Sequence, residues 1–238
     1  MDVLFGILIP FIGTVLGSVM VFFMKSNLNR KIEILILGFA SGVMVAASIW
    51  SLIIPAIELN FFGVVIGLIL GFLLFWFMDF WMLKNEKKKD FNKLLFAITL
   101  HNVPEGMAIG CAFASYLSGD LSISLISCYL LSLGVGIQNF PEGMIVSLPM
   151  YKEGNSRIKS FGYGVLSALF ELGGAIVTIF FASIINFILP YLLAAAAGAM
   201  FYVVITELIP ESEDKYKLNV LGFLLGFLIM MILDVTLG

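Results

Sequence analysis

Long runs of apolar residues, separated by short polar segments, dominate this chain. A helix needs roughly 20 residues to cross the apolar layer of a bilayer, which is about 30 Å thick, so runs of this length predict membrane-spanning helices. We predict eight of them. Their expected bounds are Val3–Met24, Ile34–Ile57, Phe61–Phe80, Leu94–Leu117, Leu121–Met150, Ser160–Leu189, Tyr191–Leu208 and Leu218–Val235. Only Met1 and Asp2 precede the first run, whereas a signal peptide opens with a basic stretch, so we interpret this run as a retained span.

The composition supports the same class of protein. Of 238 residues, 61% are hydrophobic and 12% are charged, against about 25% charged residues in an ordinary soluble domain. So few charges cannot cover the surface of a soluble fold of this size. We therefore predict an all-α membrane protein in which residues 1–238 form a single transmembrane domain. Cys111 and Cys128 lie in or beside apolar runs, and we interpret both as buried apolar residues.

The positions of the basic residues predict the orientation. All 13 Lys and Arg residues fall in the polar segments after the first, third, fifth and seventh runs. They are Lys25, Arg30, Lys31, Lys84, Lys87, Lys88, Lys89, Lys93, Lys152, Arg157, Lys159, Lys215 and Lys217. Because basic loops stay on the cytoplasmic side, we expect these four segments in the cytoplasm and both termini on the extracytoplasmic side. A wrong number of spans would destroy this alternation of basic segments, so the alternation supports a count of eight spans.

Ionisable groups inside an apolar span are costly and usually functional. Glu105, Glu142 and Glu171 lie inside three different spans, and His101, the one histidine of the sequence, lies beside the first of them. Counted from the nearest cytoplasmic lysine, the three glutamates lie about 15–18 Å deep. That is the middle of an apolar layer about 30 Å thick. We predict that the three carboxylates meet there. Glu207 lies nearer the cytoplasmic face and receives no role from the sequence.

Two of these glutamates belong to matching motifs. The segments His101-Asn102-Val103-Pro104-Glu105-Gly106-Met107 and Gln138-Asn139-Phe140-Pro141-Glu142-Gly143-Met144 agree at Asn, Pro, Glu, Gly and Met, 37 residues apart. A proline inside a helix removes a backbone donor and kinks the helix, which is tolerated at depth only beside protein or water. A glycine lets a neighbouring helix approach closely. Two such motifs on neighbouring helices predict one shared site.

Helical spacing indicates how the polar side chains share that site. Residues three or four apart lie on one face of a helix. His101 and Asn102 are therefore neighbours of Glu105, and Gln138 and Asn139 are neighbours of Glu142. Each glutamate lies between two faces, in a position to bridge two adjacent metal ions.

The ligand types indicate the class of cargo. An imidazole with carboxylates and amide oxygens suits zinc, iron, manganese or cadmium, whereas an all-oxygen site suits calcium or magnesium and a thiolate site suits copper(I). The ligand types do not rank zinc against the other three, because geometry and availability decide that. The motifs contain no Lys or Arg, which argues against an anionic substrate. Polar contacts that only hold helices together are the structural alternative.

Together these features resemble the ZIP (Zrt/Irt-like) family of metal transporters. The paired motifs resemble its signature, and the eight-span topology and the segment that begins at Glu171, Glu-Leu-Gly-Gly, fit it as well. Gln138 in place of histidine, and the segment Ser48-Ile-Trp-Ser-Leu-Ile-Ile-Pro-Ala-Ile-Glu58, are similar to the prokaryotic GufA-type branch. The resemblance covers nearly the whole chain and implies a multi-pass protein of a prokaryotic inner or plasma membrane.

The resemblance also implies a ligand set and a mechanism. One metal ion would be held by His101, Glu105, Gln138 and Glu142, and a second by Asn102, Glu105, Asn139, Glu142 and Glu171. It implies a homodimer in which spans one, four, five and six carry the metal, elevator-like, against a scaffold of spans two, three, seven and eight. The chain departs from many family members in having Gln138 for histidine and a Lys-rich rather than His-rich loop after span three. Metal sensing by that loop is not expected.

A fainter internal similarity concerns the second and seventh spans. Ser41-Gly42-Val43-Met44 is similar to Ala197-Gly198-Ala199-Met200, and both spans end near Ile-Pro. An inverted 3+2+3 repeat around the central pair of spans would explain this. Chance similarity between helices rich in small residues is the alternative.

We therefore predict transport of a divalent transition metal into the cytoplasm, with zinc the leading candidate, as a substrate rather than a cofactor and without enzyme activity. The expected partners are divalent metal ions, the lipid bilayer and a second copy of the chain, with no nucleic acid. Two other classes stay open: an intramembrane zinc-dependent hydrolase, and a proton-coupled carrier of organic solutes with Glu105 and Glu142 as proton relays.

Overall fold

The computed structural model describes residues 2–23, 29–83, 91–119, 123–152, 154–212 and 217–237. All regular structure in these ranges is helical. The elements are α1 (Asp2–Phe23), α2 (Arg30–Ala47), the π-helix η1 (Ser48–Ile53), α3 (Ile54–Leu83), α4 (Phe91–Leu117), α5 (Leu125–Lys152), α6 (Arg157–Val203), the π-helix η2 (Val204–Leu208), α7 (Ile209–Glu211) and α8 (Leu218–Leu237). The basic segment Lys84–Lys89, predicted to be cytoplasmic, lies outside the described residues.

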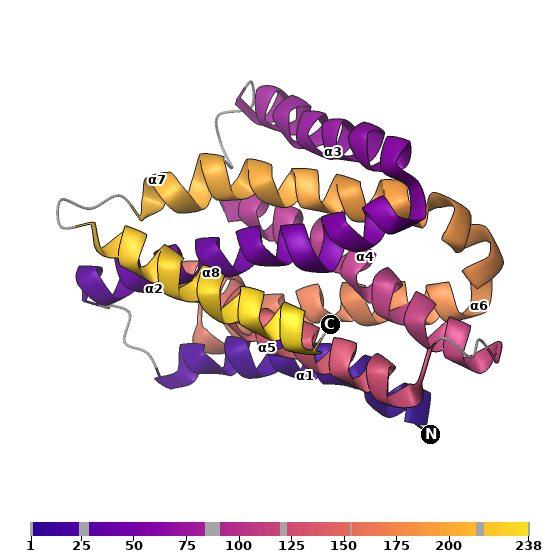
Figure 1. Cartoon of the computed structure of the whole chain (residues 1–238). Helices are drawn as coiled ribbons and strands as arrows, with labels where there is room; N and C mark the ends of the chain where they lie inside the picture. The colour runs from indigo at the N-terminus through magenta and orange to yellow at the C-terminus, as the bar shows by residue number, and fades with distance from the viewer. Residues whose placement is uncertain are drawn as a thin grey trace.

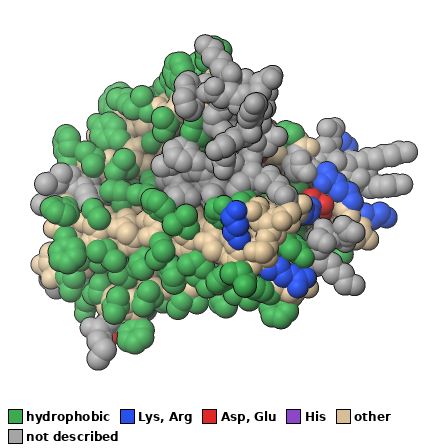
Figure 2. All heavy atoms as spheres, turned by 180° about the vertical axis from the view of Figure 1, so that it is seen from behind, with side chains coloured by type: hydrophobic (Ala, Val, Ile, Leu, Met, Phe, Trp, Pro, Cys, Tyr) green, Lys and Arg blue, Asp and Glu red, His purple; other side chains and the backbone are tan. Residues whose placement is uncertain are grey.

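The surface is that of a protein surrounded by lipid. Large apolar side chains point outward, among them Phe62 at 77% and Phe180 and Phe187 at 79% exposure. Figure 2 shows hydrophobic side chains over much of one face, and the Lys and Arg side chains that it colours lie from the middle of the view to its right. A soluble monomer does not expose apolar area on this scale, because it would aggregate. The prediction of an all-α membrane protein is confirmed.

Five segments among the described residues are long and apolar enough to cross a membrane. They are Asp2–Phe23, Arg30–Met78, Arg157–Ala182, Phe187–Leu208 and Leu218–Thr236. Both α4 and α5 lie outside this set, and these are the two helices that carry the polar motifs.

The long helical segment from Arg30 contains the break predicted between the second and third spans. The helix is interrupted at Asn60, whose φ of −163° and ψ of 101° are those of extended backbone. The Asn60 side chain accepts a hydrogen bond from the Gly63 amide at 3.0 Å. This is the contact of a helix N-cap, in which the side chain satisfies a backbone donor left free at the helix start. The predicted break between Ile57 and Phe61 therefore corresponds to a capped kink.

The break in α6 differs from the prediction. We expected it at Pro190, between the sixth and seventh spans, but the non-helical residue is Phe181, with φ −120° and ψ 26°. The helix continues through Pro190. A proline costs one hydrogen bond without always ending a helix, and the sequence around it is apolar on both sides, so the pattern holds no signal for where the chain bends. The predicted bounds of these two spans are wrong by several residues.

Two short π-helices occur at matching places. η1 begins four residues after Met44, and η2 begins four residues after Met200. Each is followed by an Ile-Pro pair, Ile54-Pro55 and Ile209-Pro210. A proline ring clashes with the carbonyl four residues earlier, and a wider π turn before it relieves that clash. Such π turns occur frequently at functional sites.

The helices pack as two bundles. We call α1, α4, α5 and the part of α6 before Phe181 the motif bundle, and α2, η1, α3, the rest of α6, η2, α7 and α8 the flanking bundle. Within the motif bundle α4 packs chiefly on α6 and α1 on α5, and within the flanking bundle α2 packs on α8 and α3 on α6. In Figure 1 the helices run roughly side by side, and α1 begins at the same end of the molecule at which α8 ends.

Glycines let the helices touch within each bundle. A Cβ on Gly17 of α1 would collide with the Phe140 carbonyl of α5, and one on Gly42 of α2 would collide with the Phe223 carbonyl of α8. Among the described glycines, each one whose Cβ would collide with the backbone of another helix lies against a helix of its own bundle. Small residues allow close backbone packing between membrane helices. Each bundle is therefore tightly packed internally.

The contact between the bundles is different. It is an apolar interface made of side chains, to which Met44 and Met200 contribute from the flanking bundle and Met107 from the motif bundle. At one end, Lys152 of α5 forms an ion pair with Glu33 of α2, and Arg30 pairs with the same carboxylate at 3.1 Å. Methionine is flexible and packs adaptably, so this interface depends less on fixed backbone contacts than the packing inside each bundle does.

We expect Gly17→Ala to destabilise the protein, because its Cβ overlaps the Phe140 carbonyl and forces α1 and α5 apart. Overpacking of this kind costs about 1–3 kcal/mol, so the melting temperature in detergent should fall. Gly134→Ala is the matched control, since Gly134 is also buried inside a helix but has nothing within 4 Å of its would-be Cβ. Equal melting temperatures for the two variants would contradict the proposed close contact.

Candidate metal site

Six of the seven predicted site residues are buried inside the motif bundle. Exposure is 2% or less for Asn102, Glu105, Gln138, Asn139, Glu142 and Glu171. They come from α4, α5 and α6, the three helices that the prediction required to converge. The backbone of His101 lies in α4, but its side chain is outside the described part of the chain. No described glutamate of the motifs points to lipid.

Gln138 joins the glutamates of the two motifs. Its side-chain amide nitrogen donates to Glu105 Oε1 at 2.7 Å, across from α5 to α4. The same nitrogen donates to Glu142 Oε1 at 3.3 Å, within α5. The i to i+4 pairing of Gln138 with Glu142 follows the predicted helical spacing. The Gln138 amide thus holds two carboxylates from two helices close to one point.

Asn139 connects α5 to the third glutamate. Its side-chain nitrogen donates to both carboxylate oxygens of Glu171, at 2.8 and 2.7 Å. It also lies 3.4 Å from the Pro10 carbonyl of α1. Asn139 directly follows Gln138 in α5, so the two amides lie on the same turn of that helix. Both motifs and Glu171 therefore surround one region, which is the arrangement the depth estimate predicted.

Asn102 reaches a residue that the sequence did not single out. Its side-chain nitrogen donates to Ser167 Oγ on α6 at 3.1 Å. Both residues are fully buried. Ser167 lies four residues before Glu171, so the two share a helix face. That spacing is the one signal from which the sequence could have identified Ser167.

Three amide oxygens at the site have no hydrogen-bond partner among the described residues. Asn102 Oδ1, Gln138 Oε1 and Asn139 Oδ1 are buried, and no described group lies within hydrogen-bond distance of them. An unsatisfied buried polar atom costs about 1–3 kcal/mol, so native proteins rarely keep one without a reason. Each of these amides uses its nitrogen toward protein and leaves its oxygen available. Amide oxygens are metal ligands, so the donor set fits a bound cation.

Glycine contacts hold the motif helices in place. A Cβ on Gly106 would collide with the Glu171 carbonyl of α6, and one on Gly143 would collide with the Thr14 carbonyl of α1. The prediction that these glycines permit close helix packing is confirmed. α4 and α5 stay helical through Pro104 and Pro141. Each proline therefore removes a backbone donor beside the site without ending its helix.

The candidate ligands are mixed rather than purely acidic. Among the described residues, no three His, Cys, Asp or Glu side chains form a group that could hold a metal ion by themselves. The amide groups of Gln138 and Asn139 lie against the carboxylates instead. Cys111 and Cys128 are both buried, as predicted, and form no disulfide with each other. Glu207 lies in η2, apart from the motif bundle.

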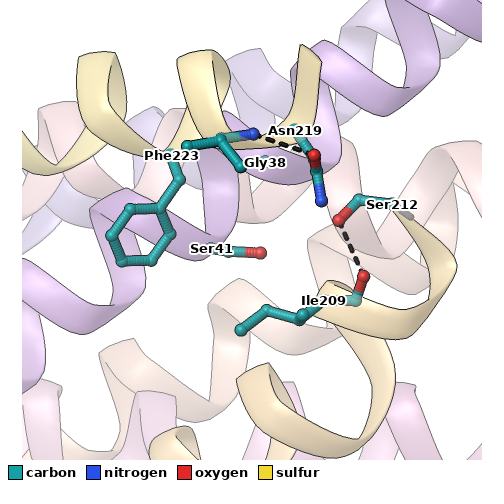
Figure 3. Close-up of a pocket in the computed structure, with 7 residues that line it drawn as sticks. Gly38, Ser41, Ile209, Ser212, Asn219 and Phe223 are labelled. Atoms are coloured by element: carbon teal, nitrogen blue, oxygen red, sulfur yellow. Dashed lines mark hydrogen bonds between the residues drawn. The ribbon is translucent and has the colours of Figure 1, made fainter. Parts of the chain in front are cut away.

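A pocket of about 180 Å³ lies elsewhere, in the flanking bundle (Figure 3). It is lined by Gly38, Ser41, Ile209, Ser212, Asn219, Val220 and Phe223. Its polar atoms make local bonds: Ser41 Oγ donates to the Leu37 carbonyl, Ser212 Oγ donates to the Ile209 carbonyl, and Asn219 Oδ1 accepts from the Val220 amide. No predicted ligand lines this pocket, so it is separate from the candidate site.

Comparison with known proteins gives consistent matches. The family described as ZIP Zinc transporter matches residues 91–234, which contain both motifs and Glu171. The chain is 31% identical to Zinc transporter ZIP11 of Homo sapiens, with 94% of each sequence covered. It is 33% identical to Zinc transporter GufA of Myxococcus xanthus, over 95% of each. It is 34% identical to Zinc transporter ZIPB of Bordetella bronchiseptica, over 96% of this chain and 79% of that protein.

Proposed function

Because this chain belongs to the ZIP zinc transporter family, we propose that it carries a divalent transition metal, zinc foremost, across a membrane into the cytoplasm. Family members are named as transporters rather than enzymes. Iron, manganese and cadmium suit the same ligand types and are secondary candidates. The metal is a substrate that the site binds and releases.

The observation that carries the proposal is the buried set of carboxylates and amides at one point of the motif bundle. Three glutamates and three amides lie together with almost no exposure, and three amide oxygens have no described hydrogen-bond partner. A divalent cation would give these oxygens the partner that they lack among the described residues. Charged groups at this depth are otherwise too costly to keep.

The same arrangement supports a site for two ions. The Gln138 side-chain amide bonds to both Glu105 and Glu142. Asn139 lies against Glu171, with Asn102 on the facing helix next to Ser167. We propose that Glu105 and Glu142 bridge the two ions, because helical spacing puts each carboxylate next to both polar neighbours of its motif. We propose His101, Glu105, Gln138 and Glu142 for one ion, and Asn102, Glu105, Asn139, Glu142 and Glu171 for the other.

The two bundles support an elevator-type movement. Among the described glycines, the close contacts with the backbone of another helix lie within each bundle, whereas apolar side chains such as Met44, Met107 and Met200 pack between the bundles. A rigid motif bundle that slides along the flanking bundle would carry the metal with it. We further propose eight spans, because the kinks at Asn60 and Phe181 each divide a long helix in two. The matching π-helices η1 and η2 support the inverted 3+2+3 repeat. Extracytoplasmic termini and a homodimer complete the proposal.

Glu105→Ala and Glu142→Ala are each expected to reduce zinc flux into proteoliposomes by more than about 100-fold, because loss of a ligand should exceed the 10–100-fold effects of groups that only support ligands. Asp2→Asn is the matched control, since Asp2 is an exposed acidic residue at the start of α1. Melting temperatures near that of the parent protein would show that the variants fold. Unchanged flux in both glutamate variants would refute the site.

Zinc is expected to stabilise the purified protein in detergent. At a free concentration 100 times the dissociation constant, binding adds about 2.7 kcal/mol, and equilibrium dialysis should count two ions per chain. The Glu105→Ala variant should lose this stabilisation. If an organic solute, and not zinc, stabilised the purified protein, the protein would be a solute carrier. Zinc retained after dialysis against a chelator would indicate a permanently held ion, as a hydrolase requires.

Cross-linking the bundles is expected to stop transport. With both native cysteines replaced by alanine, Glu33→Cys and Lys152→Cys would be joined by a reducible bifunctional reagent, because these side chains are in contact between α2 and α5. Zinc flux should fall at least about tenfold and return after reduction, because cleavage of the cross-link lets the two bundles move against each other again. The control pair is Asp2→Cys with Tyr129→Cys, which lie together inside the motif bundle. Full flux in the cross-linked Glu33–Lys152 protein would rule out movement between the bundles.

A further inference from the structure

Ser167 is a buried hydroxyl group that none of the proposed ligand sets includes. It lies on α6, one helical turn before Glu171, and has 0% exposure. Its Oγ accepts a hydrogen bond from the side-chain nitrogen of Asn102 at 3.1 Å. The contact joins α4 to α6 beside the candidate site, three residues before Glu105. A fully buried serine in this place either fills space between the helices or supports a functional residue.

The direction in which each amide points separates Asn102 from the other two. A side-chain amide has a donor end and an acceptor end. Near carboxylates the donor end is attracted to the negative charge, and this is the orientation of Gln138 and Asn139. Asn102 has no described bond to a carboxylate, because its donor end is held by the Ser167 hydroxyl.

The consequence concerns the other end of that amide. With its nitrogen on Ser167, Asn102 keeps Oδ1 buried and without a hydrogen-bond partner among the described residues. A neutral oxygen in this place can coordinate a cation, whereas an amide nitrogen cannot. If Asn102 turned its nitrogen to the carboxylates instead, it would compete with the cation for them.

We propose that Ser167 is a positioning residue for the metal: its hydroxyl fixes the Asn102 amide so that Oδ1 faces the carboxylates as a ligand. This inference rests on the proposed transport function. Groups that orient ligands typically contribute 10–100-fold to metal affinity or activity. Ser167 acts through Asn102 and does not itself touch the ion.

A double-mutant cycle tests this, with the apparent KM for zinc flux in proteoliposomes as the readout. Ser167→Ala and Asn102→Ala should each raise KM about tenfold. The double variant should be no worse than Asn102→Ala alone, because Ser167 has nothing left to orient. Losses that add in the double variant would mean that Ser167 only packs, and would overturn the proposal, as would an unchanged KM in Ser167→Ala.

Two further variants sharpen the result. Ser167→Thr keeps the hydroxyl, so its KM should equal that of the parent protein. The proposal would be overturned if the threonine variant had a normal melting temperature but the same raised KM as Ser167→Ala. If the added methyl group prevents folding, the double-mutant cycle decides alone. Ser132→Ala is the matched control, since Ser132 is a fully buried serine of the motif bundle whose hydroxyl donates to the Cys128 carbonyl at 3.0 Å. Its KM should not change.

Failure of this inference can be told apart from failure of the proposed function. If Glu105→Ala abolishes flux while the cycle is additive, the site stands and Ser167 has no positioning role. If Glu105→Ala leaves flux unchanged, the site itself is wrong, and the positioning proposal falls with it.

Discussion

The structure depends on the burial of three carboxylates in a part of the molecule surrounded by lipid. Glu105, Glu142 and Glu171 are 2% exposed or less, and a charge at such depth survives only with partners. Gln138 and Asn139 partly stabilise these carboxylates by donating amide hydrogen bonds to them. Those bonds require α4, α5 and α6 to approach within a side chain's length. The glycine-lined contacts of the motif bundle follow from this requirement, because bulkier residues would hold the helices apart.

The need for rigid packing around the site also explains the division into two bundles. Ligands from three helices keep their geometry only if those helices move together. Backbone contacts through Gly106, Gly143 and Gly174 join α4, α5 and α6 to their neighbours within the motif bundle. The flanking bundle has its own glycine contacts, such as Gly42 and Gly226 between α2 and α8. Between the bundles, flexible side chains such as Met44 and Met107 form the boundary. Rigid packing within each bundle and adaptable packing between them would suit the elevator-type movement proposed above.

How far the sequence predicts this molecule differs between features. Membrane class, the helices and the convergence of the motif residues follow from hydrophobic length, helical spacing and depth, and the kink at Asn60 lies in the predicted gap between Ile57 and Phe61. The bend at Phe181 was not predictable, because apolar residues flank it on both sides, and the predicted boundary fell between Leu189 and Tyr191 instead. Ser167 and the Glu33–Lys152 ion pair were missed because both are contacts between distant segments, and a single sequence encodes such contacts only through the fold.

The distribution of positive charge gives the strongest reason to regard the site as one for a cation. The sequence has no Lys or Arg between Lys93 and Lys152, and none between Lys159 and Lys215. The helices that carry the three glutamates therefore hold no permanent positive side chain at the depth of the site. Amide groups reduce the cost of burying the carboxylates but do not cancel their charge. A lysine or arginine there would have satisfied the carboxylates and closed the site, since a paired carboxylate has little affinity left for a metal. Because no Lys or Arg of these helices lies at the depth of the site, a divalent cation can bind to the carboxylates and leave again.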